Sequence, residues 1–313
     1  MNTNPARAFS ASRIRRVFSA LFCVSALAFN ANAAPQESSA QSVKSGGLER
    51  TFALHVGKAV DPGHPAPLVI VLHGSGGNGK GMERVTGFDR IADREGFIVA
   101  YPDGIGKHWN DGRRAERFDV VKDIDDIQFL RDLVADIEKS HKLDHRRIFC
   151  AGFSNGAFMA NRAGVETSDL FAAVAPVSGT LSASYSDRIT PKDAISVLII
   201  HGTKDGVVPY AGGEIGHDGP PGVCIGASNM VSKWSRAVDA PQEGITTMLP
   251  DTDPNDGCRV TESIHAGSKA TIEFLSIDGG THSWPGSGKR LGVCHDINGS
   301  EVIWDFFKSH PKP

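Results

Sequence analysis

Short apolar runs alternate with amphipathic stretches along most of the chain. Each run is rich in valine, isoleucine, leucine and alanine, which is typical of parallel strands buried on both faces. We expect such strands at residues 68–72, 97–101, 147–151, 172–177, 197–201 and 271–277. An earlier stretch, residues 50–56, alternates apolar and polar positions and predicts an antiparallel edge strand.

The segments between these strands carry apolar residues at helical spacing. The clearest pattern runs from Ile127 to Ile137, and three aspartates at positions 123, 125 and 126 lie where the positive end of its helix dipole would be. We expect further helices at residues 82–94, 155–163, 228–238 and 300–308. The alternation of strands and helices predicts an α/β fold, a mostly parallel sheet flanked by helices. In such sheets, ligands bind at the carboxyl ends of the strands.

The first 33 residues have the layout of a secretory signal peptide. Four arginines precede an uncharged, mostly apolar run at residues 17–29, and Ala31-Asn32-Ala33 follow. Because a membrane span needs about 20 apolar residues, we expect cleavage after Ala33, secretion to the periplasm or the medium, and no stable membrane anchor. Residues 34–47 contain one large apolar residue, Val43, and predict a flexible leader. Residues 48–313 are then expected to form one catalytic domain.

Charge and cysteine content narrow the possible partners. The formal charge is −3, and it becomes about −7 once the four arginines of the signal are removed, which argues against nucleic-acid binding. Cys150 lies in an apolar run and is expected to be an inert buried thiol, whereas Cys224, Cys258 and Cys294 lie in loop-like segments. An oxidising compartment would allow one disulfide among these three, with the pairing open and Cys258 with Cys294 favoured. No spacing typical of a zinc site is present, so no metal is expected.

The sharpest motif is Gly152-Phe153-Ser154-Asn155-Gly156, which follows a predicted strand and opens a predicted helix. This is the G-x-S-x-G nucleophile elbow of the α/β-hydrolase fold in the context that it requires. Small residues flank the serine because the turn is strained and packs closely against the strand and the helix. The sequence therefore predicts Ser154 as a nucleophile.

A second motif, residues 72–77 (LHGSGG), directly follows an early strand. In this fold the corresponding loop supplies one backbone N–H of the oxyanion hole, and the residue after the nucleophile supplies the other. We expect the amides of Ser75 and Asn155 to be these donors. Residues 74–80 also fit the G-x-x-x-x-G-K pattern of a phosphate-binding loop, but Gly81 stands where a Ser or Thr hydroxyl should hold magnesium. A nucleotide binder is therefore kept only as the alternative from another class of protein.

A nucleophilic serine needs a base and an orienting carboxylate, which follow it in this fold in the order Ser, acid, His. Asp205 (HGTKDGVVP) and His282 (GGTHSWPG) both lie in glycine-bounded loops after predicted strands and in this order. His73 and His201 also follow strands, but each precedes a glycine and is expected to support loop geometry. Asp205 is favoured as the acid because of its place at a strand end, and four other carboxylates remain competitors: Asp251, Asp253, Asp256 and Asp278.

At these residues the chain resembles the polyhydroxybutyrate-depolymerase-like esterases, a group that includes feruloyl and acetylxylan esterases. The segments that carry the resemblance are LHGSGG, YPDG, HWND, DIDDIQFLRDLV, GFSNGAFMA, HGTKDGVVPY, LPDTDPNDG, GGTHSWPG and SEVIWDFF. The resemblance extends from about residue 50 to residue 309. The chain departs from many relatives at HGSGG, where a cysteine or glycine often follows His-Gly, and at Thr281, which replaces a third glycine.

The resemblance implies a secreted carboxylic ester hydrolase of the α/β-hydrolase superfamily with a Ser154, Asp205, His282 triad and no cofactor. It also implies that Trp109 and Trp284 line the cleft. No substrate-binding domain is apparent, which weakens the case for a true polymer depolymerase. The segments around residues 178–196 and 210–228 are too short for a large helical lid, so we expect an open cleft that takes a small or polymer-linked ester. A serine peptidase of the same fold remains an alternative, and the oligomeric state stays open.

Overall fold

The structure of the protein is a computed structural model that describes residues 38–113, 121–216, 222–288 and 291–313. All of these belong to one unit, Glu37–Pro313. The expected signal peptide, and the leader up to residue 37, lie outside the described residues. No helix in the described ranges is long and apolar enough to cross a membrane.

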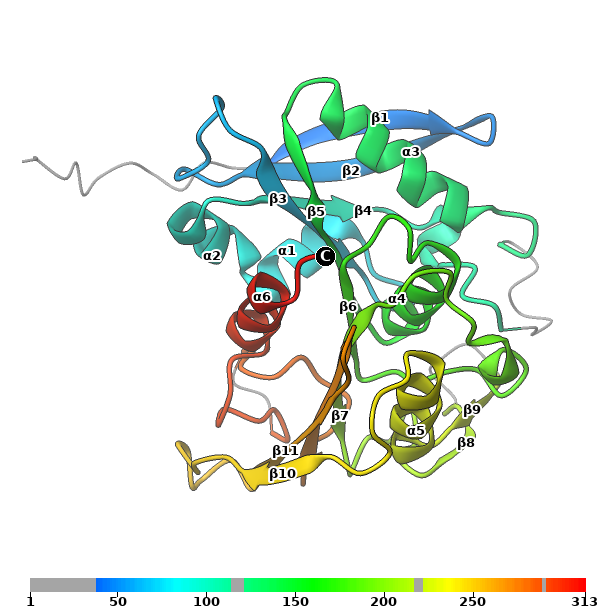
Figure 1. Ribbon diagram of the computed structural model, residues 1–313, viewed down its shortest axis with the longest axis vertical. Helices are drawn as coiled ribbons and strands as arrows, with labels where there is room; N and C mark the ends of the chain where they lie inside the picture. The colour runs from blue at the N-terminus through cyan, green and yellow to red at the C-terminus, as the bar shows by residue number, and fades with distance from the viewer. Residues whose placement is uncertain (1–37, 114–120, 217–221, 289–290) are drawn as a thin grey trace, which may run out of the picture. The chain divides into compact units, whose positions relative to one another are not determined.

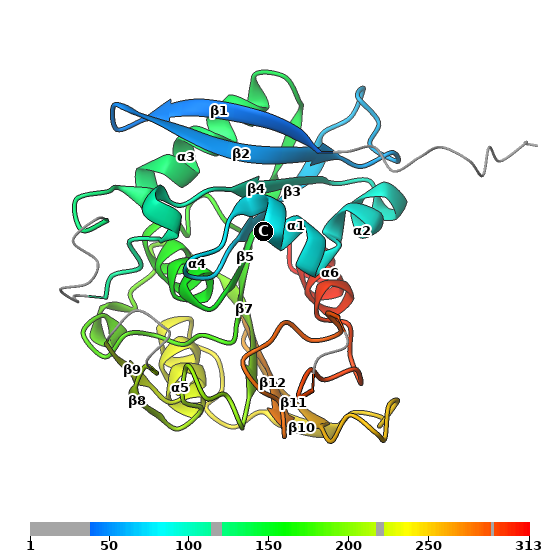
Figure 2. The same ribbon diagram turned by 180° about the vertical axis from the view of Figure 1, so that it is seen from behind.

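Parallel strands form the centre of the sheet, and antiparallel pairs extend it at both edges. The parallel strands are β3 (Ala66–Leu72), β4 (Ile98–Pro102), β5 (Leu143–Phe153), β6 (Ala173–Val177), β7 (Ser196–Gly202) and β12 (Thr271–Asp278). The antiparallel strands are β1 (Ser39–Ser45), β2 (Leu48–Val56), β10 (Ile245–Met248) and β11 (Arg259–Ala266). Within the described ranges these make one ten-stranded sheet of order β1-β2-β4-β3-β5-β6-β7-β12-β11-β10 (Figures 1 and 2).

Helices cover both faces of this sheet (Figures 1 and 2). One face carries α1 (Gly79–Thr86), α2 (Phe88–Glu95) and α6 (Gly299–Ser309), and the other carries α3 (Asp126–Glu138), α4 (Asn155–Glu166) and α5 (Ala227–Ala237). The apolar side chains of the two helix groups belong to two separate core clusters, one on each side of the sheet. The mostly parallel α/β-hydrolase architecture expected from the sequence is confirmed.

The expected flexible leader is wrong over residues 39–45, which form β1 and pair in register with β2. Val43 and Ser45 are buried, and Val43 joins the core cluster on the α3 side. Backbone hydrogen bonds to β2 hold this strand in place, so it needs few apolar side chains. A prediction based on apolar content therefore misses it. As a result β2, expected at the edge, lies inside the sheet between β1 and β4.

The helix expected at residues 82–94 is instead two helices, because Gly87 between α1 and α2 has a left-handed φ of 60°. The late strands β10 and β11 were not predicted, because both are antiparallel and carry many polar residues, and β10 is only four residues long. Only small elements lie near the carboxyl ends of the strands in the described ranges: η1 (Ile105–Lys107), η3 (Ser186–Arg188), β8 (Gly212–Glu214) and β9 (Val223–Ile225). None of them has the size of a helical lid.

Candidate active site

Ser154 occupies the sharp turn between β5 and α4. Its φ of 55° and ψ of −117° are strained for a residue with a side chain. The flanking glycines are required by close packing. A Cβ at Gly152 would lie 2.1 Å from the carbonyl oxygen of Gly156, and one at Gly156 would lie 2.4 Å from the carbonyl oxygen of Leu72. The turn thus has the geometry of the predicted nucleophile elbow, and Ser154 stays 8% exposed.

His282 and Asp205 extend a hydrogen-bonded chain from this serine. Nε2 of His282 lies 3.0 Å from Oγ of Ser154, and Nδ1 lies 2.8 Å from Oδ2 of Asp205. The two residues meet because they follow β12 and β7, which are parallel neighbours in the sheet. The Asp205 side chain is fully buried, whereas that of His282 is 17% exposed. Such a chain can move a proton from the serine to an imidazole held in one tautomer.

The other oxygen of Asp205 is fixed by its own loop. Oδ1 accepts hydrogen bonds of 2.8 Å from the backbone N–H groups of Val207 and Val208. Nε2 of the fully buried His201 lies 2.9 Å from the carbonyl oxygen of Val208, so it braces the same turn. Burial lowers the pKa of His201, and the Asp205 charge only partly opposes this. A neutral His201 therefore supports the loop, whereas the competing Asp278 accepts a hydrogen bond from the Thr203 hydroxyl.

The two expected oxyanion-hole donors both belong to residues close to the nucleophile. Ser75 is in the loop after β3, where a Cβ at Gly74 would lie 3.3 Å from Cβ of Ser154. Asn155 is the first residue of α4, so its N–H lies outside the intrahelical hydrogen bonds. Over the described ranges, neither N–H has a hydrogen-bond partner in the protein. This agrees with both amides remaining candidates for the expected donors.

The loop at residues 108–111 connects these two donors. The Asn155 side chain accepts a hydrogen bond of 2.8 Å from the Trp109 N–H and donates one of 2.6 Å to the Asp111 carboxylate. On the other side, Nδ1 of His108 lies 2.8 Å from Oγ of Ser75. This HWND segment is part of the family resemblance, which implied a role only for its tryptophan. The contacts join positions up to 46 residues apart, so no local spacing could have indicated them.

Trp109 does not line the cleft, and the expectation for it is wrong. The side chain is fully buried, and its ring N–H donates to the carbonyl of His73. Its ring stacks on Phe129 in the core, so the tryptophan supports the loop after β3 from inside the protein.

Trp284 contributes to a cleft of about 580 Å³ next to His282, although its side chain is only 2% exposed. The other apolar lining residues are Met82, Val85, Phe153, Leu291 and Val293. Arg84 adds a cationic group to this lining. The cleft is large enough for an apolar ester group and lies where such a group would reach the imidazole.

The phosphate-loop alternative gains no support from the structure. The N–H of Gly79 at the start of α1 donates to the Asp103 carboxylate at 2.8 Å, where a phosphate would have to bind. Nζ of Lys80 lies 3.0 Å from the Glu83 carboxylate instead of facing an open loop. An anion at this helix start would meet a carboxylate.

Known proteins resemble this chain in sequence, two of them over most of its length. It is 31% identical over 262 residues to NocK of Nocardia uniformis subsp. tsuyamanensis, named as an esterase by inference, covering 79% of this chain and 74% of that protein. It is also 31% identical over 255 residues to Feruloyl esterase B of Piromyces equi, covering 79% of this chain but only 43% of that protein. Poly(3-hydroxyalkanoate) depolymerase C of Paucimonas lemoignei is 28% identical over 132 residues, covering 40% of this chain and 31% of that protein.

Solved structures share the fold. The acetyl xylan esterase from Aspergillus awamori has a TM-score of 0.62 at 15% identity, covering 86% of this chain and 99% of that chain. The fold and the nucleophile elbow place the protein among the α/β hydrolases. Residues 51–208 match the family described as Esterase PHB depolymerase. The chain belongs to this family and is a carboxylic ester hydrolase, which confirms the resemblance stated from the sequence.

Proposed function

We propose that the protein is a secreted serine esterase that works through an acyl-enzyme intermediate on Ser154. The observation that carries this proposal is the hydrogen-bonded chain from Ser154 through His282 to Asp205. In the first step His282 takes the proton of Ser154, whose Oγ attacks the ester carbonyl. The carbonyl then re-forms, the alcohol leaves with the proton from His282, and water hydrolyses the acyl-enzyme by the same route.

The amides of Ser75 and Asn155 stabilise the oxyanion in both steps. Each can donate to the oxygen on which negative charge develops, and removing one such donor typically lowers kcat by about 10²–10³. Asp205 stabilises the imidazolium and keeps the His282 tautomer that faces the serine. No cofactor takes part in this scheme.

We propose small or polymer-linked esters as substrates. The cleft beside His282 supports this, because its walls are mostly apolar and the described segments near it hold no large helical lid. The names of the relatives point to feruloyl, acetylxylosyl and hydroxyalkanoate esters as the groups to test. The export step is proposed from the layout of residues 1–33.

The deciding experiment is turnover of these esters, together with matched amides, by the purified protein and by Ser154→Ala. The wild type should hydrolyse at least one ester with a burst of alcohol equal to the active sites. Ser154→Ala should lose activity by several orders of magnitude with an unchanged circular dichroism spectrum. Normal turnover by a folded Ser154→Ala protein, or cleavage confined to amides, would contradict the proposal.

A further inference from the structure

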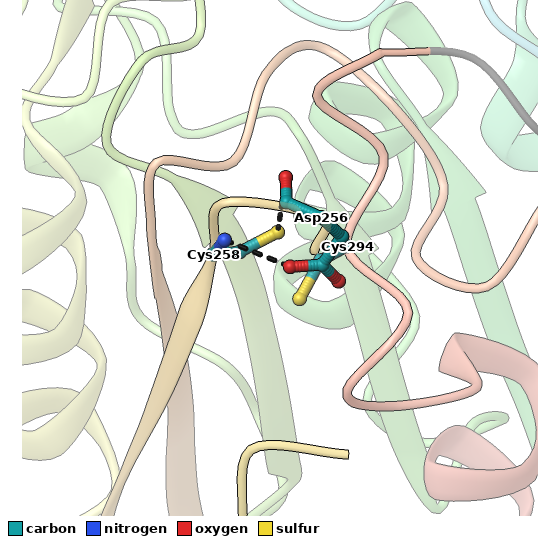
Figure 3. A group of neighbouring side chains, drawn as sticks. All are labelled: Asp256, Cys258 and Cys294. Carbon is teal, nitrogen blue, oxygen red and sulfur yellow. Dashed lines mark hydrogen bonds between the residues drawn. The ribbon is translucent and has the colours of Figure 1, made fainter. Parts of the chain in front are cut away.

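Two buried thiols meet beside the segment that carries His282. Cys258 directly precedes β11, and Cys294 lies between His282 and α6. Each is 1% exposed, and the two Sγ atoms and a carboxylate oxygen of Asp256 all lie within 4.8 Å of one another (Figure 3). In the structure both cysteines are in the thiol form.

Hydrogen bonds hold the two loops together without the sulfur atoms. Oδ2 of Asp256 accepts a bond of 2.6 Å from the His295 N–H. Oδ1 of Asp296 accepts bonds of 2.7 Å and 3.0 Å from the N–H groups of Thr252 and Asp253. The loops that carry the two cysteines are therefore already fixed next to each other, which removes most of the entropy cost of joining them.

A metal ion fits this group less well than a sulfur–sulfur bond does. A closed structural zinc site takes four ligands, and over the described ranges this group offers three. Both oxygens of Asp256 already accept backbone hydrogen bonds, from Cys258 and from His295. The other two described cysteines, Cys150 in β5 and Cys224 in β9, are not part of the group.

We infer that Cys258 and Cys294 are joined by a disulfide in the exported protein. The two thiols lose two protons and two electrons as the Sγ–Sγ bond forms, and a disulfide oxidant takes them up and becomes two thiols. Oxidised glutathione or an oxidoreductase of the compartment supplies this oxidant. The inference rests on the export step of the proposed function, because a reducing compartment would keep the thiols.

The bond should form while the chain folds. Burial raises the pKa of both thiols, so few thiolates are present once the loops have closed. Buried sulfur atoms are also poorly accessible to an oxidant.

The bond would fix the loop that presents the base. Gly292 accepts hydrogen bonds from the N–H and the hydroxyl of Thr281, next to His282. The carbonyl of Cys294 accepts a bond from the Gly286 N–H. The closed ring from Cys258 to Cys294 contains His282. The disulfide would therefore join the two ends of the segment that carries His282.

The test is refolding of the purified, denatured protein in a glutathione redox buffer or in excess dithiothreitol. After alkylation and digestion without reduction, the glutathione sample should contain a peptide pair joined through Cys258 and Cys294. The midpoint of thermal unfolding should be about 5–10 °C lower for the dithiothreitol sample. Cys258→Ser and Cys294→Ser should each remove this difference, and the control Cys224→Ser should keep it.

Three results would overturn the inference: both thiols alkylated in the glutathione sample, a linkage to a different cysteine, or stoichiometric zinc that a chelator removes from the thiol form. The peptide map is made with the wild-type protein, so it tests the disulfide even if a variant fails to fold. Ester hydrolysis is measured separately. An active enzyme with free thiols contradicts only the disulfide, and an inactive, folded protein with the disulfide contradicts only the proposed esterase mechanism.

Discussion

Nδ2 of Asn155 lies 2.6 Å from Oδ2 of Asp111, so the residue after the nucleophile is tied by its side chain to a loop far away in sequence. Asp111 is in turn paired with the buried Arg113. In the proposed mechanism, the same residue supplies an oxyanion donor from its backbone and an anchor from its side chain. The loop that it anchors carries His108, whose Nδ1 lies 2.8 Å from Oγ of Ser75, the residue that carries the other proposed oxyanion donor.

Asn155→Ala should lower kcat by about tenfold to a hundredfold, less than the loss of a whole oxyanion donor. The backbone N–H remains, but the anchors to Trp109 and Asp111 are lost, so the donor and the loop become less well placed. KM should change little. Steady-state kinetics with a soluble ester measures this, and Gln128→Ala on the exposed face of α3 is the control. An unchanged kcat would show that the side-chain anchor does not matter.

The sequence predicted the parallel strands well because a strand buried on both faces must be apolar throughout. It missed β1, whose place depends on backbone pairing with β2, and the break at Gly87, which depends on one left-handed residue. In the site, chain order and strand ends were sufficient to bring Asp205 and His282 to the serine. The contacts of Asn155 could not be predicted, because they depend on how distant loops pack.

Gly156→Ala should lower the free energy of unfolding by about 1–3 kcal/mol. Its Cβ would lie 2.4 Å from the Leu72 carbonyl oxygen, so α4 or β3 would have to shift. Gly206→Ala is a matched control for stability, because a Cβ there would meet no atom within 4 Å. Urea unfolding measures both variants. Equal stability of the two would mean that the elbow is less tightly packed than the structure indicates.

Stability should fall as the pH drops below about 6.5. Burial lowers the pKa of His73 and of His201 from the ordinary 6.5, so the unfolded chain takes up protons that the folded chain refuses. Each group then contributes a loss of at most about 1.4 kcal/mol per pH unit between the unfolded and the folded pKa. Urea unfolding at pH 7.5 and pH 5 measures the loss. His201→Gln should reduce it, and the exposed control His145→Gln should leave it unchanged.

Glu273→Gln should stabilise the protein at pH 8 and have little effect near pH 4. Burial, helped by the charge of Glu262, raises the pKa of Glu273 from 4.5 to about 7. A raised carboxyl pKa means that the folded state resists ionisation, so stability is lost as the pH rises from about 4.5 through 7. Removing the charge should regain about 1–3 kcal/mol at pH 8. If the variant is no more stable than the wild type at pH 8, the ionised Glu273 carboxylate does not destabilise the folded state and this prediction is wrong.

Asp205→Asn should lower kcat by up to about four orders of magnitude while substrate affinity changes little. The amide can donate to Nδ1 of His282, which favours the tautomer with its proton on Nε2, facing Oγ of Ser154. That imidazole cannot accept the serine proton, and no carboxylate remains to stabilise the imidazolium. The turn itself should survive, because the amide oxygen can still accept the N–H bonds of Val207 and Val208.

Asp278→Asn is the matched control, since Asp278 also lies at the carboxyl end of a strand but accepts a hydrogen bond from Thr203 rather than from the base. Single-turnover kinetics with an activated ester would locate the Asp205→Asn loss in acylation, and thermal unfolding would show that the fold persists. If Asp278→Asn were the more damaging change, or if a folded Asp205→Asn enzyme kept its acylation rate, another carboxylate would have to orient His282. The 2.8 Å contact between Asp205 and His282 would then be structural, and the proposed triad would be wrong at its acid.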